Sequence, residues 1–173
     1  MRRILRLCTA AFCVAAAPVI ATVGSAHSAA AATPPACATA GLVIWLNTDG
    51  DHAAGSSYYK LEFTNLSGHA CTLQGFPGVS ALSLAGRQLG KPAARARTGT
   101  PRQIRLANTA TAVAVLRLVS VQNFPAASCR PVTAAAFRVY PPNQTASRTV
   151  PFPFGSCSRS GPVFLFVRAV QKA

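Results

Sequence analysis

The sequence is poor in acidic residues, and this shortage excludes some enzyme classes. Its 173 residues include 17 Lys and Arg but only three acids, Asp49, Asp51 and Glu62. A glycosidase needs two carboxylates that face each other across a cleft. Asp49 and Asp51 fall in one short stretch, and Glu62 is expected on the wet face of a strand. The sequence therefore disfavours glycoside hydrolysis.

Histidine and methionine are also scarce, which disfavours hydrolytic and electron-transfer sites. A serine triad needs a histidine beside its nucleophile. Only His52 and His69 follow the amino-terminal segment, and no G-x-S-x-G motif occurs. A blue-copper site usually needs a methionine besides two histidines and a cysteine, and Met1 is the only methionine. We therefore expect no catalytic residues and no cofactor.

No ligand pattern indicates a metal site. The cysteines form no C-x-x-C pair, and none lies at metal-ligand spacing from two others. The stretch from Asn47 to Asp51 places oxygen ligands at alternate positions, as the start of a calcium loop does. His52 stands where such a loop needs glycine, however, and Tyr58 stands where it needs a bidentate acid. A solvated loop between strands is the better interpretation, and we expect no metal.

The amino-terminal residues have the pattern of an export leader. Residues 1–7 are basic, residues 8–23 are almost wholly apolar, and small residues follow. This order predicts a cleavable signal peptide over residues 1–30. A short linker, residues 31–36, and one domain, residues 37–173, would follow it. We expect a secreted protein with no membrane span after cleavage.

Four cysteines remain after the leader: Cys37, Cys71, Cys129 and Cys157. An even number in an exported chain indicates two disulfides. Four cysteines allow three pairings. We favour two pairs, Cys37 with Cys71 and Cys129 with Cys157, because each would join the start of one strand region to a nearby later one.

Short strands separated by turns account for the rest of the chain. The stretch from Tyr59 to Thr64 alternates apolar and polar residues, as in a strand with one buried face. Turn residues follow at 65–68. No stretch after the leader has a sustained helical period. We therefore predict an all-β fold, an immunoglobulin-like antiparallel β-sandwich of about seven to nine strands with two disulfides.

Individual residues indicate which segments are buried, which lie at a sheet edge and which form loops. Trp45, the only tryptophan, is most simply a core anchor of the first strand. Pro151 and Pro153 suit a strand at a sheet edge. Residues 91–100 have no apolar period and are expected to form a long loop. The expected strands cover residues 41–47, 58–64, 79–84, 102–107, 111–121, 132–140, 145–152 and 163–170. A returning strand that contains Cys71 is expected before residues 75–78, which break it.

A basic segment is the strongest candidate for a binding surface. Guanidinium forks suit phosphate- or carboxylate-rich polymers of the cell envelope. Nucleic acid would be attracted as well, but an exported protein rarely meets it and the segment has no aromatic residue for stacking. A solvated basic face without a ligand is the alternative. Six basic residues lie within nineteen positions with no acid among them: Arg87, Lys91, Arg95, Arg97, Arg102 and Arg105.

Two motifs resemble those of a known family. The chain contains L-x-F-T-N at residues 61–65 and C-x-L-x-G-F-P-G-V at residues 71–79. Cys37 and the step Gly55-Ser56 come before these motifs, and Cys129 and Cys157 come after them. In these features the chain resembles a family of secreted actinobacterial domains, the domain of unknown function 4232. The resemblance covers nearly all of the chain after the leader. It implies a small exported β-sandwich and carries no catalytic residues and no ligand.

Together these features predict a secreted, non-catalytic binding or interaction module. Its partner would be an anionic cell-envelope polymer, contacted through the basic segment, or another secreted protein. Two alternatives stay open: an envelope-associated hydrolase with an unrecognised site, and a passive structural protein without a ligand. A pocket that collected an acid beside His52 or His69 would favour the hydrolase.

Overall fold

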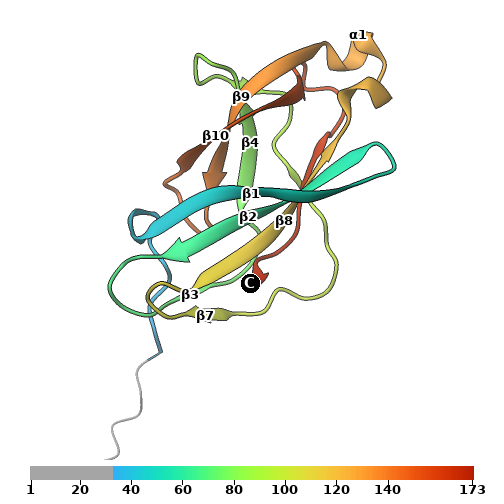
Figure 1. Cartoon of the computed structure of the whole chain (residues 1–173). Helices are drawn as coiled ribbons and strands as arrows, with labels where there is room; N and C mark the ends of the chain where they lie inside the picture. Colours follow the sequence, from blue (N-terminus) through green and yellow to red (C-terminus); the bar gives the residue numbers. More distant parts are fainter. Residues whose placement is uncertain (1–32) are drawn as a thin grey trace, which may run out of the picture. The chain divides into compact units, whose positions relative to one another are not determined.

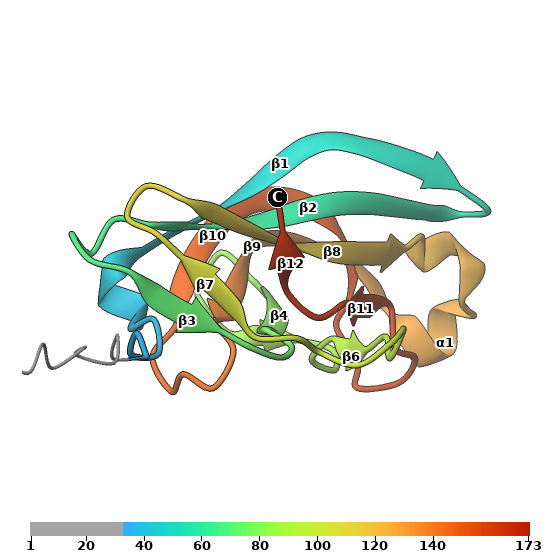
Figure 2. The same cartoon turned by 90° about the horizontal axis from the view of Figure 1, so that it is seen from below.

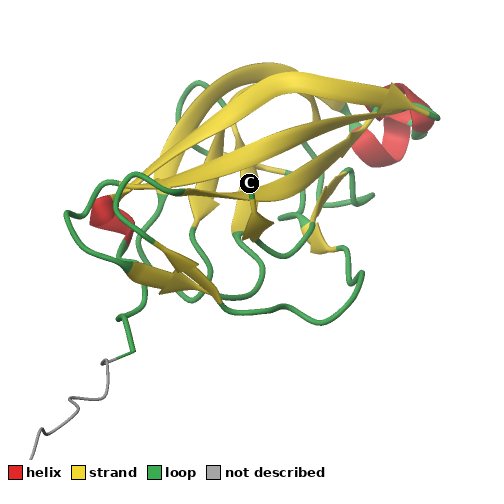
Figure 3. Ribbon diagram, turned by 60° about the horizontal axis from the view of Figure 1, so that its bottom comes forward, coloured by secondary structure: helices red, strands yellow, loops and turns green. Residues whose placement is uncertain are grey.

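The structure, a computed structural model, describes residues 33–173. The predicted leader, residues 1–30, lies outside the described residues. No helix in the described part of the chain is long and apolar enough to cross a membrane. Strands dominate this part, and its short helical turns lie at the two ends of the strand layers, as Figure 3 shows.

The elements follow one another from η1 to β12 in chain order. The helical turns are η1 (Thr39–Gly41), η2 (Val121–Asn123) and α1 (Ala126–Cys129). The first six strands are β1 (Leu42–Ala53), β2 (Ser56–Asn65), β3 (Cys71–Leu73), β4 (Gly78–Leu82), β5 (Gln88–Leu89) and β6 (Ala94–Arg95). The last six are β7 (Ile104–Leu106), β8 (Thr111–Val119), β9 (Pro131–Tyr140), β10 (Arg148–Cys157), β11 (Leu165–Val167) and β12 (Gln171–Lys172).

Two larger sheets form the layers of the sandwich. One has the order β1-β2-β8-β11-β6, with β12 also paired to β8, and the other has the order β10-β9-β4-β5. Strands of the two sheets cross one another in Figure 1. A small third sheet pairs β3 with β7. The predicted all-β sandwich with two disulfides is confirmed. The strand count exceeds the prediction mainly because β5, β6 and β12 are two-residue strands, too short for a hydrophobic period.

The hairpin of β1 and β2 is longer than the sequence predicts. The sequence predicts a loop over residues 48–55, but β1 continues to Ala53, which pairs with Ser56. The register shifts between Asn47 and Asp51, so the intervening residues form a bulge. A bulge places extra residues in one strand without ending the pairing. The glycine and aspartates that predict a loop therefore mark a bulge within a strand.

The core lies between the two larger sheets. Phe63 of β2 and Phe137 of β9 are fully buried. Phe137 stacks on Phe154 with 4.3 Å between ring centroids, and Tyr59 meets Phe152 edge-on at 5.2 Å. Tyr59 belongs to one sheet and Phe152 to the other, so this aromatic cluster joins the layers. Such pairs add to the stabilisation from burial alone.

The predicted proline-bearing strand lies at a sheet edge. It is β10, the first strand in the order β10-β9-β4-β5. Its register against β9 shifts between Pro151 and Phe154, around residues that include Pro153. Since proline cannot donate to the ladder, the shift allows β10 to continue to Cys157.

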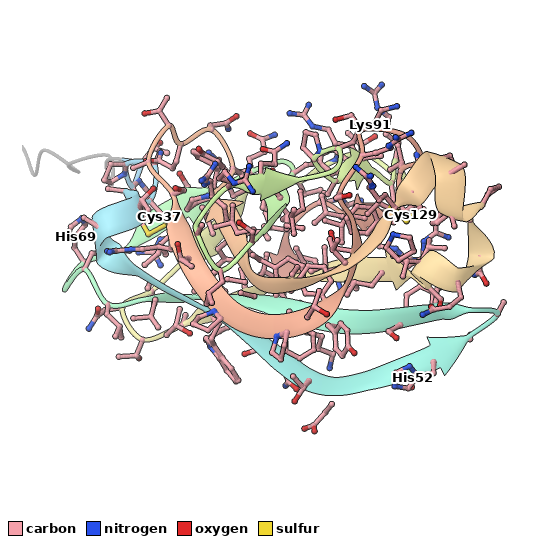
Figure 4. All side chains as sticks on the ribbon, turned by 90° about the horizontal axis from the view of Figure 1, so that it is seen from above. Cys37, His52, His69, Lys91 and Cys129 are labelled. Atoms are coloured by element: carbon pink, nitrogen blue, oxygen red, sulfur yellow. A yellow bond between two sulfur atoms is a disulfide. The ribbon has the colours of Figure 1, made fainter. Side chains whose placement is uncertain are left out.

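Two disulfides close the domain at opposite ends. They join Cys37 to Cys71 and Cys129 to Cys157, the pairs that the sequence analysis favours, with Cα atoms 4.9 and 4.6 Å apart. Figure 4 shows Cys37 at one end of the strand layers and Cys129 at the other. Beside the first disulfide, the Cys37 N–H donates to the Thr72 carbonyl at 2.9 Å. Each bridge thus ties a short peripheral segment to a strand.

Candidate anion-binding surface

All six residues of the predicted basic segment are exposed, but the fold distributes them over several elements. Arg87 lies in the turn between β4 and β5, Lys91 follows β5, Arg95 is in β6, Arg97 follows β6, Arg102 precedes β7 and Arg105 is in β7. Figure 4 shows Lys91 toward the Cys129 end of the domain. The segment is therefore an extended basic strip, and only part of it lines a cavity.

The middle of this strip is attached to the sheet and is not the free loop that the sequence predicts. Arg95 of β6 is in parallel register with Val167 of β11. The Ala96 N–H donates to the Val167 carbonyl at 2.9 Å. The Arg95 guanidinium lies 5.7 Å from the centroid of the Phe76 ring, within cation–π range. The backbone and side chain of Arg95 are thus held while its surface stays exposed.

A groove of about 480 Å³ opens between the segment before β7 and the carboxyl-terminal strand. Arg102 lines one wall, and Arg168 and Lys172 line the other. Figure 2 shows β7 and β12, which mark the two walls, on the same side of the domain. No acidic residue lines the groove. Four neutral side chains with polar hydrogens also line it: Thr98, Thr100, Gln103 and Gln171.

Backbone hydrogen bonds hold both walls of this groove. On the carboxyl-terminal side, the Arg168 N–H donates to the Val115 carbonyl at 2.9 Å, and Lys172 pairs with Ala112 of β8. On the other side, β7 pairs with β3 through residues 104–106. Arg168 and Lys172 therefore project from hydrogen-bonded backbone, and Arg102 lies two residues before the paired strand β7.

The residues that line the groove carry charge of one sign only. From Phe63 to Ala173 the chain contains thirteen Lys and Arg residues and no Asp or Glu. All three acids lie earlier, on β1 and β2. Most of the cations therefore have no carboxylate with which to pair, and only solvent ions or an anionic partner can balance them. Such a surface attracts polyanions over a distance of about 10 Å at 0.1 M salt.

Two of the acids line a second pocket of about 360 Å³. Asp49 comes from the bulge of β1, Asp51 is the paired residue that follows the bulge, and Lys60 and Arg168 line the same pocket. The third acid, Glu62, accepts a hydrogen bond from Asn47 Nδ2 at 3.1 Å. This pocket thus mixes both signs of charge, in contrast to the groove.

Neither histidine joins the two acids. His52 Nδ1 lies 2.9 Å from Ser57 Oγ, and His69 Nδ1 lies 3.1 Å from the Ser67 carbonyl oxygen. Figure 4 places His52 and His69 at opposite ends of the domain. The acid pocket therefore lacks the histidine that would favour a hydrolase. Within residues 33–173, no three His, Cys, Asp or Glu side chains gather closely enough to hold a metal ion.

Comparison with known families decides what the chain is related to. The family described as a domain of unknown function, DUF4232, matches residues 37–170. The chain belongs to this family. No curated protein and no solved structure matches the DUF4232 domain described here. The family description assigns no activity.

The two motifs that mark this DUF4232 domain serve its fold. Phe63 and Asn65 of L-x-F-T-N are fully buried, and Cys71 and Val79 of C-x-L-x-G-F-P-G-V are each 2% exposed. Cys71 is also half of a disulfide. The burial of these residues accounts for the motifs without a ligand, so a binding surface must be sought elsewhere on the DUF4232 domain.

Sequence reasoning missed the other two basic residues that line the groove with Arg102. Arg168 and Lys172 stand outside the predicted basic segment, near the end of the chain. The available signal was that Arg168 and Lys172 also belong to the acid-free part of the sequence. Without the pairing of β12 on β8, nothing in the sequence places them opposite Arg102.

Sequence reasoning also placed Trp45 wrongly. The side chain is 45% exposed, and the neighbouring apolar residue on the same face of β1, Val43, is 47% exposed. Trp45 pairs with Glu62, which is on the outer face of β2. The core side of β1 is taken instead by Leu42, which is 2% exposed, and by Ile44. Trp45 is therefore a surface residue and not a core anchor.

Proposed function

We propose that this DUF4232 domain, exported by an actinobacterial cell, is a non-catalytic binding module that contacts anionic polymers of the cell envelope. The observation that carries the proposal is the acid-free, exposed strip that contains Arg95, Arg97 and Arg102. Phosphate or carboxylate groups on a polymer would form charge-assisted hydrogen bonds with these guanidinium groups. Release of counterions from the polymer would add to the affinity.

The disulfides support an extracellular location. Both bridges are structural, since each ties a peripheral segment to a strand, and such disulfides persist in oxidising compartments outside the cytoplasm. The predicted leader agrees with this location. A protein outside the cell meets envelope polymers more readily than nucleic acid, so we propose the polymer as the partner.

The non-catalytic role is supported by how the reactive side chains are dispersed. General acid–base chemistry needs a titratable group within hydrogen-bond reach of the reacting atoms. The pocket of Asp49 and Asp51 has no histidine in its lining, and the groove has only basic and neutral side chains. The arrangement therefore suits binding better than bond cleavage.

Retention on a cell-envelope fraction tests the proposal. The purified exported protein is mixed with the insoluble fraction at low ionic strength, and the bound protein is eluted with increasing salt. We expect retention at low salt and elution at moderate salt, because exposed charge pairs are screened. The variant R95Q/R97Q/R102Q should lose most of this retention.

A matched variant separates a specific surface from net charge. K60Q/R130Q/R159Q also removes three positive charges, all from exposed positions outside the basic strip. It should keep most of the retention. Equal loss of retention in the two variants would show that retention depends only on net charge. Absence of retention at low salt would refute the proposed function in favour of a passive structural protein.

A further inference from the structure

We infer that the groove lined by Arg102, Arg168 and Lys172 is a discrete site for a phosphate monoester. The phosphate would belong to the anionic polymer of the proposed function, on which this inference rests. Long-range attraction requires only net charge. A recognition site requires cations and donors held on both sides of one cavity, and the groove has them.

The number of cations favours phosphate over carboxylate. A carboxylate carries one charge on two oxygens, whereas a phosphate monoester carries between one and two charges on three free oxygens. Arg102 from one wall and Arg168 and Lys172 from the other supply three positive charges, of which that of Arg168 is shared with the pocket of Asp49 and Asp51. The planar forks of Arg102 and Arg168 can each donate two hydrogen bonds to phosphate oxygens.

The neutral side chains of the groove agree with an oxyanion ligand. Thr98 and Thr100 contribute hydroxyl groups, and Gln103 and Gln171 contribute amides, all of which can donate hydrogen bonds. No carboxylate lines the groove to repel an anion or to attract a cation. The groove therefore favours ligands that carry many hydrogen-bond acceptors.

The carboxyl-terminal wall is organised before a ligand arrives. The Val170 N–H donates to the Gly75 carbonyl at 2.9 Å, and Val170 is only 4% exposed. This buried anchor lies between Arg168 and Lys172 in the chain. Binding then costs little ordering of the backbone on this wall, and more of the interaction free energy appears as affinity.

The groove is larger than a phosphate group alone. Its volume of about 480 Å³ lies within the range of small-molecule pockets. The remaining space can hold the sugar or polyol that carries the phosphate. A phosphorylated polyol is therefore a better probe than inorganic phosphate.

Amide NMR titration of the exported protein with glycerol 3-phosphate tests the site. Saturable shifts should be confined to residues 98–104 and 168–172, and acetate at equal ionic strength should bind much more weakly. R168Q and K172Q should each weaken binding at least about tenfold, because each removes one or more charge-assisted hydrogen bonds. R130Q, which removes a charge outside the groove, should leave the affinity unchanged.

The outcomes separate this inference from the proposed function. Shifts that do not saturate, or that spread over basic residues outside the groove, would overturn the site. Equal binding of acetate would also overturn it. If envelope retention persists in any of these cases, only the phosphate site fails; if retention is absent as well, the proposed function fails too. Elution of envelope-bound protein by glycerol 3-phosphate at constant ionic strength would show that the polymer occupies the groove, whereas no elution would overturn that assignment.

Discussion

The side-chain amide of Asn65 donates a hydrogen bond to the carbonyl oxygen of Ala107, 3.1 Å away, and joins the end of β2 to the turn before β8. The same Nδ2 group also lies 2.8 Å from the His69 carbonyl oxygen and 3.2 Å from that of Leu106. Asn65 Oδ1 accepts from the Ser67 N–H and hydroxyl at 3.1 and 2.7 Å. The fully buried Asn65 side chain therefore connects the end of β2 to the turn at residues 67–69 and to residues 106–107.

Replacement of Asn65 by Ala should destabilise the domain by about 3 kcal/mol, because three carbonyl groups, that of Leu106 in a buried hydrogen bond, would lose their donor. The free energy of unfolding from denaturant titration measures this loss. Asn108→Ala is the control: Asn108 is exposed and accepts one hydrogen bond, from the Gly68 N–H, so it should cost about 1 kcal/mol or less. Equal losses in the two variants would contradict the role of Asn65.

The single tryptophan gives a direct optical test of the outer face of β1. Since Trp45 is 45% exposed, its fluorescence should have the red-shifted emission of a solvated indole. Iodide should quench it readily, because the basic protein attracts anions. Unfolding in denaturant should shift the emission only slightly. A blue-shifted emission that iodide does not quench would show that a partner or a second copy covers this face.

The two disulfides should contribute similarly to stability. They close loops with sequence separations of 34 and 28 residues, so the chain-entropy estimate for each is about 4 kcal/mol. The double variants C37A/C71A and C129A/C157A should therefore lose comparable free energies of unfolding. Mass mapping of the unreduced protein should recover the two pairs. Recovery of Cys37 linked to Cys129 or Cys157 would contradict the fold.

Alanine substitutions at two glycines with positive φ distinguish the cost of backbone strain from the cost of a crowded Cβ atom. Gly86 has φ 73° and open space around an added Cβ, whereas Gly90 has φ 61° and its Cβ would lie 2.9 Å from the Cys157 carbonyl oxygen. Gly86→Ala should cost about 1 kcal/mol. Gly90→Ala should cost at least about 1 kcal/mol more, because the crowded atoms belong to backbone and a buried ring. Equal denaturant midpoints would contradict this packing.

Local patterns were enough to predict much of the fold. Alternation from Tyr59 to Thr64 identifies β2, because its two faces differ in polarity. The prolines of β10 indicate an edge, since they cannot donate to a neighbouring strand. The alternation fails for β1, in which Val43 and Trp45 are as apolar as Leu42 and Ile44. A period of two does not show which face is buried when both faces are apolar.

The candidate site was only partly predictable for a different reason. Arg102 stands out by its basic neighbours in the sequence. Lys172 is 70 positions away, and it reaches the same groove only because β12 pairs with β8. Such long-range pairing depends on how whole strands pack, and no local pattern encodes it. The acid-free composition was visible in the sequence, but the groove was not.

The most direct test of the central claim is the salt dependence of binding to an anionic envelope polymer. Affinities for the wild type and for R95Q/R97Q/R102Q are measured over a range of salt concentrations. The logarithm of the wild-type association constant should fall linearly with the logarithm of salt concentration, and the variant should bind more weakly with a shallower slope. Affinity that does not change with salt, or identical slopes for the two proteins, would contradict binding through this basic surface.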